Sequence, residues 1–345
     1  MAPACWLDRV PAGWDALLAA DPNATAAHRP DLWAALAAAV PGLRPGVIAV
    51  ERDGALVGGA PLVIERRAGL EWLHAMPWLL PGAPLAAPGR HDEVDAAVAE
   101  ALATLQRERG VVGGAWVLYR PDGPEAAPPS VARPSGETRR LASALVHLAD
   151  GPEAAFRRAD RKTRQAVARA AAAGLAFAEE PAAVAAAYAL HARQARGWRG
   201  HRALPLELSR RLLAAPAPPG LDGPPARLFT VRDARGLLCA ALALDHPRDV
   251  LVWWSGAHPE ARPRGAFAFL LWSIVAWAAA RGRARVNLGA SAGLDPVAAF
   301  KDALGARPHA YAVRWLDARH AGARGRLVGA LQARLRRGRA RGVPA

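Results

Sequence analysis

"VWWSGAHPEARPRGAFAFLLWSIVAWAAARG", residues 252–282, combines a strand, a loop and a helix. The apolar run 250–256 is typical of a buried strand, and the loop after it contains Pro259, Pro263 and Gly265. The uncharged run 266–280 is shorter than the roughly 20 residues that cross a bilayer. We therefore predict a buried helix over 263–282, in contact with a sheet to which the strand belongs.

The segments on both sides extend this unit. "RLFTVRDARGLLCAALALD" (227–245) is two apolar runs around a turn at Asp233 to Gly236, which predicts a β-hairpin. After the helix we predict a strand over 284–289, a short helix over 295–304 and a closing strand over 309–316. This order of strands and helices is typical of a mixed α/β sheet with helices on its faces.

The first half of the chain repeats the same pattern. "GVIAVERDGALVGGAPLVIE" (46–65) is a second predicted hairpin, with its turn at Asp53-Gly54. The two hairpins are about 180 residues apart, which is too far for a solenoid repeat and fits a duplicated domain. The Pro-rich stretch 120–136 indicates a boundary or a surface loop. We expect one domain over residues 1–150, a second over 151–318 and a basic amphipathic tail over 319–345.

Composition narrows the class of protein. The formal net charge is +15, which favours contact with anions, although a coding bias toward arginine would give the same charge. Two cysteines make no disulfide framework and match no metal-binding spacing, so no metal is expected. The N-terminus carries acidic residues and lacks the pattern of a signal peptide. We predict a cytoplasmic protein.

Three stretches together resemble a known family: "RKTRQAVARAAAAGL" (161–175), the opening stretch (252–282) and "VNLGASAGLDPVAAFKDALGARP" (286–308). They are similar to the FemAB-type acyltransferases of the GNAT superfamily. The resemblance implies an α/β (α+β) fold of tandem GNAT-like domains, each a mixed central sheet flanked by helices. It also implies transfer of an acetyl or aminoacyl group to an amine, on a cell-envelope or polysaccharide precursor. Acyl-CoA or aminoacyl-tRNA would be a co-substrate, with no tightly bound cofactor.

The two lysines are the most unusual residues of the chain. All other basic side chains among the 45 Lys and Arg are arginines, and the lysines are Lys162 and Lys301. An ammonium is a compact point charge, whereas a guanidinium is a planar fork, so a site that needs the former keeps its lysine. The resemblance places Lys301 where FemAB-type enzymes have a lysine that stabilises the oxyanion. The competing interpretation is a solvated lysine on a helix surface.

Tyr311 and the loop 261–267 complete the predicted chemistry. Tyr311 is a candidate proton donor to the leaving group, or else a half-buried strand tyrosine. The resemblance makes Arg262, Arg264 and Gly265 candidates for the phosphates of the donor, at a helix N-terminus. However, Phe267 stands where the GNAT pattern has Gly or Ala, and Pro263 removes an amide donor, so the usual coenzyme A loop is impaired.

Further candidates have simple structural alternatives. Asn287 and Ser291 follow the predicted strand and are candidates for cofactor binding, or else form its terminal turn. Lys162 and Arg164 are candidates for substrate binding, or else belong to a solvated basic helix. Trp254 is a further candidate for substrate binding, with core packing as the alternative.

Three acidic or imidazole side chains are candidate general bases: Asp245, His246 and Asp295. No spacing in the sequence favours one of them, and turn chemistry accounts for the first two.

The sequence is also compatible with two other functions. An aminoacyl-tRNA donor is favoured by the charge and by the impaired loop, which makes tRNA a candidate partner. A second alternative is a non-catalytic GNAT-like module that binds an acidic partner or membrane through the tail. Leu327, Val328, Leu331 and Leu335 share one helical stripe there, among many arginines. Peripheral contact with the inner membrane face is therefore also expected, whereas DNA is not an expected partner.

Overall fold

The computed structural model describes residues 4–317, except for 68, 77–79, 123–136, 198–202 and 292. Its described residues divide into two compact units, one of 4–37, 41–141 and 310–317, the other of 38–40 and 142–309. Strands β7 (Thr138–His147) and β13 (Arg307–Asp317) therefore each begin in one unit and end in the other. The expected domain boundaries stay a prediction. The expected tail, 319–345, lies outside the described residues.

The first unit contains a mixed sheet with the order β1-β2-β3-β4-β6-β13. Its other strands are β1 (Ala4–Leu7), β2 (Leu43–Arg52), β3 (Ala55–Arg67), β4 (Leu70–Ala75) and β6 (Gly113–Leu118), with β5 (Leu85–Ala86) beside β3. The predicted hairpin over 46–65 is confirmed as β2 and β3. Asp53 and Gly54 both have positive φ, 51° and 76°, as the tight turns that match strand twist require.

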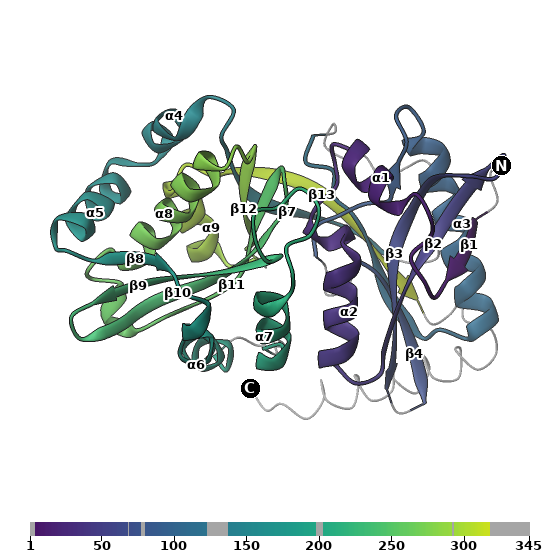
Figure 1. Ribbon diagram of the computed structural model, residues 1–345, viewed down its shortest axis with the longest axis horizontal. Helices are drawn as coiled ribbons and strands as arrows, with labels where there is room; N and C mark the ends of the chain where they lie inside the picture. Colours follow the sequence, from purple (N-terminus) through teal and green to yellow (C-terminus); the bar gives the residue numbers. More distant parts are fainter. Residues whose placement is uncertain are drawn as a thin grey trace, which may run out of the picture. The chain divides into compact units, whose positions relative to one another are not determined.

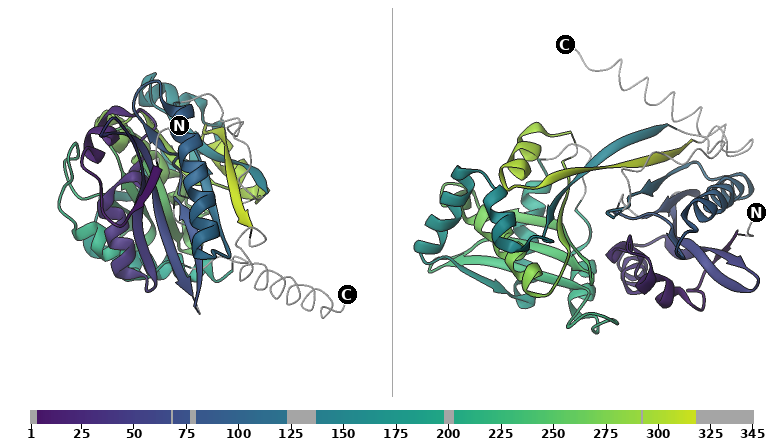
Figure 2. Two further views of the ribbon diagram at one scale, coloured as in Figure 1. Left: turned by 90° about the vertical axis from the view of Figure 1, so that its right-hand side faces the viewer. Right: turned by 90° about the horizontal axis from the view of Figure 1, so that it is seen from above.

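Helices cover both faces of this sheet (Figure 2). These are α1 (Trp14–Ala20), α2 (Pro30–Ala39) and α3 (His91–Arg109). Two consecutive glycines of β3 identify the faces, because adjacent residues of a strand point to opposite sides. A Cβ on Gly58 would meet Val94 of α3 at 2.3 Å, and one on Gly59 would come within 3.2 Å of the Trp14 ring of α1. Glycine at both positions thus lets the two helix layers pack closely.

The second unit also contains a mixed sheet, in the order β7-β12-β11-β10-β9-β8. Its strands besides β7 are β8 (Ala176–Glu179), β9 (Ala226–Asp233), β10 (Gly236–Asp245), β11 (Asp249–Ala257) and β12 (Arg285–Ala290). β11 and β12 are parallel, while the remaining pairs with a determined register in this unit are antiparallel. The predicted hairpin over 227–245 is confirmed as β9 and β10.

Helix α8 (Ala266–Ala280) forms the centre of the second unit. Its buried side chains pack with β9, β10, β11 and β12 in one core cluster, which confirms the predicted buried helix. Figure 1 shows α8 with α4 (Gly151–Arg158) and α5 (Arg161–Ala172) on one face of the sheet, and α6 (Val184–Ala195) with α7 (Leu206–Ala214) on the other. Helix α9 (Asp295–Ala303) follows β12. Within the described residues, no helix is long and apolar enough to cross a membrane.

The sequence of residues 152–174 predicts one continuous helix with Gly174 just after its end, and this prediction is wrong, because two helices form there. The chain breaks after Arg158, where Ala159 is extended with ψ 149°, and a new helix begins at Arg161. Asp160 caps it, because its carboxylate accepts a hydrogen bond from the Thr163 backbone N–H at 2.6 Å. A capping aspartate favours a helix start at this point.

Candidate functional site

The parallel strands β11 and β12 diverge beside α9. They are in register only from Asp249–Arg285 to Leu251–Asn287. β11 also carries an extra residue at Trp253, since Leu242 of β10 faces Trp254 and Ala243 faces Val252. A bulge of this kind bends a strand and ends its pairing, and such bulges are common next to active sites. The strand ends beyond these three pairs are therefore where a ligand could lie between β11 and β12.

Lys301 lies at this end of β12. It is on α9, is 8 % exposed, and its Nζ donates hydrogen bonds to the carbonyls of Gly289 at 2.8 Å and Ala290 at 3.0 Å. Burial lowers the pKa of the Lys301 ammonium to about 8, because the charged form loses solvation. The interpretation as a solvated lysine on a helix surface is wrong. Lys301 is a buried cation held by neutral acceptors.

Asn287 is completely buried on β12. Its Oδ1 accepts hydrogen bonds from Ser143 Oγ of β7 at 2.6 Å and from the Gly289 backbone N–H at 2.8 Å. The side chain therefore ties β12 to β7 and shapes the turn that follows the strand. Ser291 is partly buried, and its carbonyl accepts a hydrogen bond from the Leu294 N–H. Cofactor binding by Asn287 or Ser291 stays a prediction.

The loop before α8 holds the predicted phosphate-binding residues. Arg262 is exposed, and Arg264 makes an ion pair with Asp233 at the end of β9. Gly265 has φ +67°, and a Cβ there would meet the Ala166 carbonyl oxygen of α5 at 2.8 Å. Close packing of the loop against α5 is thus enough to explain this glycine. A role of Gly265 in holding a donor stays a prediction.

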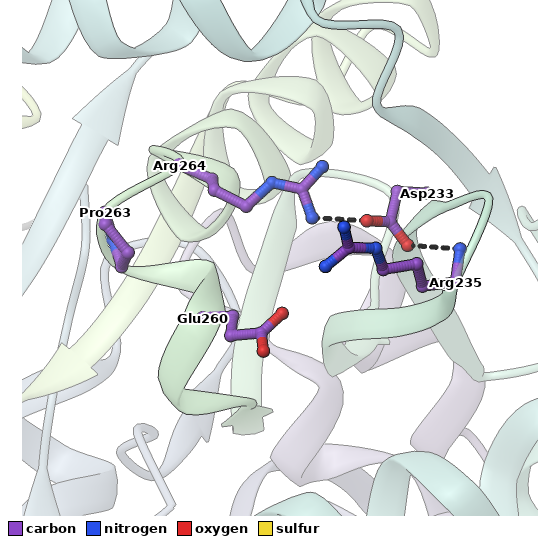
Figure 3. Close-up of a pocket in the computed structure, with 5 residues that line it drawn as sticks. All are labelled: Asp233, Arg235, Glu260, Pro263 and Arg264. Atoms are coloured by element: carbon purple, nitrogen blue, oxygen red, sulfur yellow. Dashed lines mark hydrogen bonds and ion pairs between the residues drawn. The ribbon is translucent and has the colours of Figure 1, made fainter.

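A surface pocket of about 380 Å³ lies at this loop (Figure 3). It is lined by Asp233, Arg235, Glu260, Pro263 and Arg264. In Figure 3 the Arg264 guanidinium points at the Asp233 carboxylate, which also accepts a hydrogen bond from the Arg235 backbone N–H. The hydrogen bond from Arg264 holds the pKa of Asp233 below its usual value. Both signs of charge are present, so an anion that enters the pocket competes with Asp233 for Arg264.

The predicted substrate-binding residues lie in different surroundings. Lys162 is exposed in the first turn of α5. Arg164 donates hydrogen bonds to the carbonyls of Arg157 and Ala159 at the C-terminal end of α4, where helix carbonyls lack partners within the helix. Trp254 is 8 % exposed, stacks on His191 with ring centroids 5.1 Å apart, and donates its indole N–H to Ser209 Oγ. These contacts give Arg164 and Trp254 structural roles, and substrate binding by all three residues stays a prediction.

Tyr311 lies on the part of β13 that belongs to the first unit, whereas Lys301 lies in the second. The ring is 4 % exposed and contacts Tyr119 edge to face at 5.5 Å between centroids. Burial raises the pKa of Tyr311 to about 12, so its phenol keeps its proton at neutral pH. Its role as proton donor stays a prediction.

One of the candidate bases has a structural role that the sequence does not reveal. Asp245 is completely buried and binds Arg283 through both carboxylate oxygens, at 2.9 and 3.1 Å. Among the residues that the structure describes, no group of three His, Cys, Asp or Glu side chains could hold a metal ion.

The sequence did not predict Ser143, which binds Asn287, or Asp233, which pairs with Arg264. Ser143 is 144 positions from Asn287, so no local spacing relates them. Asp233 was recognised only as a turn residue, although it pairs with the predicted Arg264.

Comparison with known proteins identifies the second unit. Residues 154–302 match the family model of the acetyltransferase (GNAT) domain. The match covers most of the second unit and less than half of the chain. The matched residues include β11, α8, β12 and most of α9, and thus both the loop before α8 and Lys301. The predicted GNAT resemblance is confirmed.

Solved structures show that the FemAB-like fold extends over most of the chain. FemX shares 11 % identity with a TM-score of 0.62, covering 89 % of this chain and 96 % of its own. The C-terminal domain of a putative lysylphosphatidylglycerol synthetase from Agrobacterium fabrum has 15 % identity and a TM-score of 0.53, covering 89 % and 91 %. A tandem GNAT protein from the clavulanic acid biosynthesis pathway has 17 % identity and a TM-score of 0.50, covering 90 % and 97 %. The predicted tandem GNAT-like fold is confirmed. No curated protein has a matching sequence.

Proposed function

We propose that this GNAT acyltransferase moves an acyl or aminoacyl group from an activated donor to an amine, with Lys301 as the group that stabilises the oxyanion. The observation that carries the proposal is the buried Lys301 ammonium where β11 and β12 diverge, bound by two carbonyls and by no carboxylate in the described residues. An ammonium has three N–H donors, so two bonds to carbonyls leave one for a substrate oxygen. A charge in a desolvated site stabilises a developing oxyanion far better than a charge in water.

The reaction requires two bond changes. The nitrogen of a neutral amine attacks the ester or thioester carbonyl, a C–N bond forms, and the π electrons move onto the oxygen facing Lys301. The intermediate then collapses, the C–O or C–S bond breaks, and the leaving alkoxide or thiolate takes up a proton equivalent to the one that the amine loses. Lys301 stabilises the oxyanion in its charged form and exchanges no proton in these steps.

The donor of this reaction is acyl-CoA or an aminoacyl-tRNA. Arg262 and Arg264 are positioned by the loop before α8, where their charges would attract the phosphates of acyl-CoA or of a tRNA end. Pro263 and Phe267 depart from the GNAT pattern, which keeps aminoacyl-tRNA as a donor beside acyl-CoA. The FemAB-like fold supports an amine acceptor on an envelope or polysaccharide precursor. The lipid named in the synthetase likeness supports contact with an acidic membrane from the cytoplasmic side.

The proposal is tested by offering three donors to the purified chain: acetyl-CoA, a long-chain acyl-CoA and a charged tRNA. A true donor should raise the melting temperature in a concentration-dependent way and transfer its labelled acyl group to one of a panel of amines. The amines should include diamines, amino sugars and amino-acid-bearing envelope precursors, with the amide product detected by mass spectrometry. Binding that weakens steeply with salt would favour the tRNA donor. A chain that neither binds nor transfers from any of the three contradicts the proposal.

Asp233→Asn should strengthen donor binding. The asparagine keeps an oxygen that can accept from the Arg235 and Gly236 N–H groups, as Asp233 Oδ1 does, but it no longer neutralises Arg264. Because partly exposed ion pairs are weak, we expect the dissociation constant of the phosphate-bearing donor to fall only about threefold. Isothermal titration calorimetry at low salt measures this change.

Glu207→Gln is the matched control for this variant. It also removes one carboxylate from an ion pair with an arginine, but on α7, away from the loop. It should leave donor affinity unchanged. An equal affinity in Asp233→Asn and wild type would mean that Arg264 does not contact the donor.

A further inference from the structure

A chain of hydrogen bonds links strand β7 to Lys301 within the second unit. Ser143 Oγ donates to Asn287 Oδ1 at 2.6 Å, and the Gly289 N–H donates to the same oxygen at 2.8 Å. The carbonyls of Gly289 and Ala290 then accept from Lys301 Nζ at 2.8 and 3.0 Å. Asn287 thus fixes the N–H of Gly289, while Lys301 binds the carbonyls of Gly289 and Ala290.

The members of this chain are buried. Ser143 is 2 % exposed, Asn287 0 % and Lys301 8 %. A buried polar group that loses its hydrogen-bond partner bears the full cost of desolvation, so each bond strongly restrains the groups that it joins. These bonds therefore keep the Gly289 and Ala290 carbonyls in place as the acceptors of Lys301.

Gly289 allows the turn that presents the two carbonyls. Its φ is +74°, in the left-handed region that residues with a Cβ rarely adopt. A Cβ built there would have nothing within 4 Å, so glycine is required by the backbone conformation and not by crowding. The Asn287 side chain stabilises this conformation by accepting from the Gly289 N–H. Together they turn the carbonyls of residues 289 and 290 toward α9.

We propose that Ser143 and Asn287 are positioning residues for Lys301, because they fix the two carbonyls that hold its ammonium and thereby aim its remaining N–H at the acyl oxygen. The inference rests on the role of Lys301 in the proposed function and adds two residues that act through Lys301. A lysine side chain has a flexible stem of four carbons, so its ammonium is pre-organised only if fixed acceptors bind it. Carbonyl acceptors suit this purpose, since they bind the ammonium without neutralising it as a carboxylate would.

The two-lysine composition allows a direct test on the 345-residue chain. Protein labelled with ¹³C,¹⁵N-lysine gives signals only from Lys162 and Lys301, and Lys162→Arg assigns them. In the wild type we expect the Lys301 Nζ–H signal to be protected from exchange with water, and its Cε shift to titrate with a pKa of about 8. The variants are Asn287→Leu, which removes the shared acceptor, and Ser143→Ala, which removes one donor. kcat and KM are measured alongside.

Asn287→Leu should raise the Nζ–H exchange rate at least tenfold and move the pKa of Lys301 up toward 10.5, because the released ammonium reaches water. kcat should fall at least tenfold with KM nearly unchanged. Ser143→Ala should change both in the same direction but less, and Ser143→Thr, which restores a hydroxyl, should recover most of kcat. Ser209→Ala is the matched control, because it removes another buried serine hydroxyl of this unit, bound to Trp254. It should leave the Lys301 signals unchanged.

The inference is overturned if Asn287→Leu and Ser143→Ala keep the wild-type exchange rate within twofold and the same pKa. If Asn287→Leu does not fold, Ser143→Ala decides alone, since it removes a single hydroxyl. The NMR measurement needs no donor or acceptor. A chain with a held Lys301 but no transfer activity would therefore contradict the proposed function and leave the positioning role standing.

Discussion

Lys301→Met is expected to lower kcat for acyl transfer about 10²–10³-fold, the usual cost of removing one oxyanion donor. Methionine has a similar length and fits a buried site, but it has no charge and no N–H group. KM for the donor should change little, because the interaction forms fully only as charge develops on the carbonyl oxygen. Steady-state kinetics with the donor identified by the binding assay measures both constants.

Lys162→Met supplies the matched control, because it removes the only other lysine of the chain, an exposed one. It should keep kcat within twofold, and both variants should keep the wild-type melting temperature within a few degrees. A Lys301→Met enzyme that retains more than a tenth of wild-type kcat would exclude oxyanion stabilisation by Lys301. Unchanged cellular phenotype in Lys301→Met would favour the non-catalytic alternative.

The pH profile separates two chemical roles of Lys301. Burial lowers the pKa of its ammonium to about 8, so the charged form predominates below that pH and is lost above it. An ammonium that stabilises an oxyanion predicts that kcat falls about tenfold per pH unit above pH 8. A neutral lysine that acts as general base predicts the opposite slope. In Lys301→Arg the guanidinium stays charged, so the residual activity should lack the alkaline decline.

The sequence was sufficient for those parts of the fold that depend on local chemistry. The hairpins over 46–65 and 227–245 follow from turn residues between apolar runs, and the buried helix over 263–282 follows from an uncharged run. Lys301 stood out because arginine replaces lysine nearly everywhere else. Each of these signals lies within one short segment, which a single sequence displays.

Features that depend on contacts between distant segments could not be predicted. The bond between Ser143 and Asn287 joins two strands that are far apart in the chain, and the ion pair of Arg264 with Asp233 joins a hairpin turn to a helix start. The break between α4 and α5 was missed because no proline or glycine interrupts the sequence there, although Asp160 is a normal capping residue. Asp245 was only one of three candidate bases in the sequence, because its burial and its arginine partners are visible only in the fold.

The largest expected loss of stability belongs to Asp245. Its carboxylate is completely buried and lies between two arginines that are themselves nearly buried, Arg283 at 2.9 Å and Arg227 at 3.6 Å. Arg227 keeps Glu179 and Asp222 in Asp245→Ala, but Arg283 loses the carboxylate that it binds, and removal of one partner from a buried pair costs about 3–5 kcal/mol. For a protein of this size, we expect the melting temperature to fall by about 10 °C. Differential scanning calorimetry measures the change.

Two further variants show whether the cost comes from orphaned charge. Asp222→Ala removes another carboxylate bound to Arg227, at 2.6 Å, but its side chain is 54 % exposed, so the loss should stay below about 1 kcal/mol. The double variant Asp245→Ala with Arg283→Met should be more stable than Asp245→Ala alone, because it removes a buried charge together with its partner. If the double variant is instead less stable by the sum of two independent losses, the cost of Asp245→Ala lies in lost packing, and the buried ion pair is not what holds β10 to the start of β12.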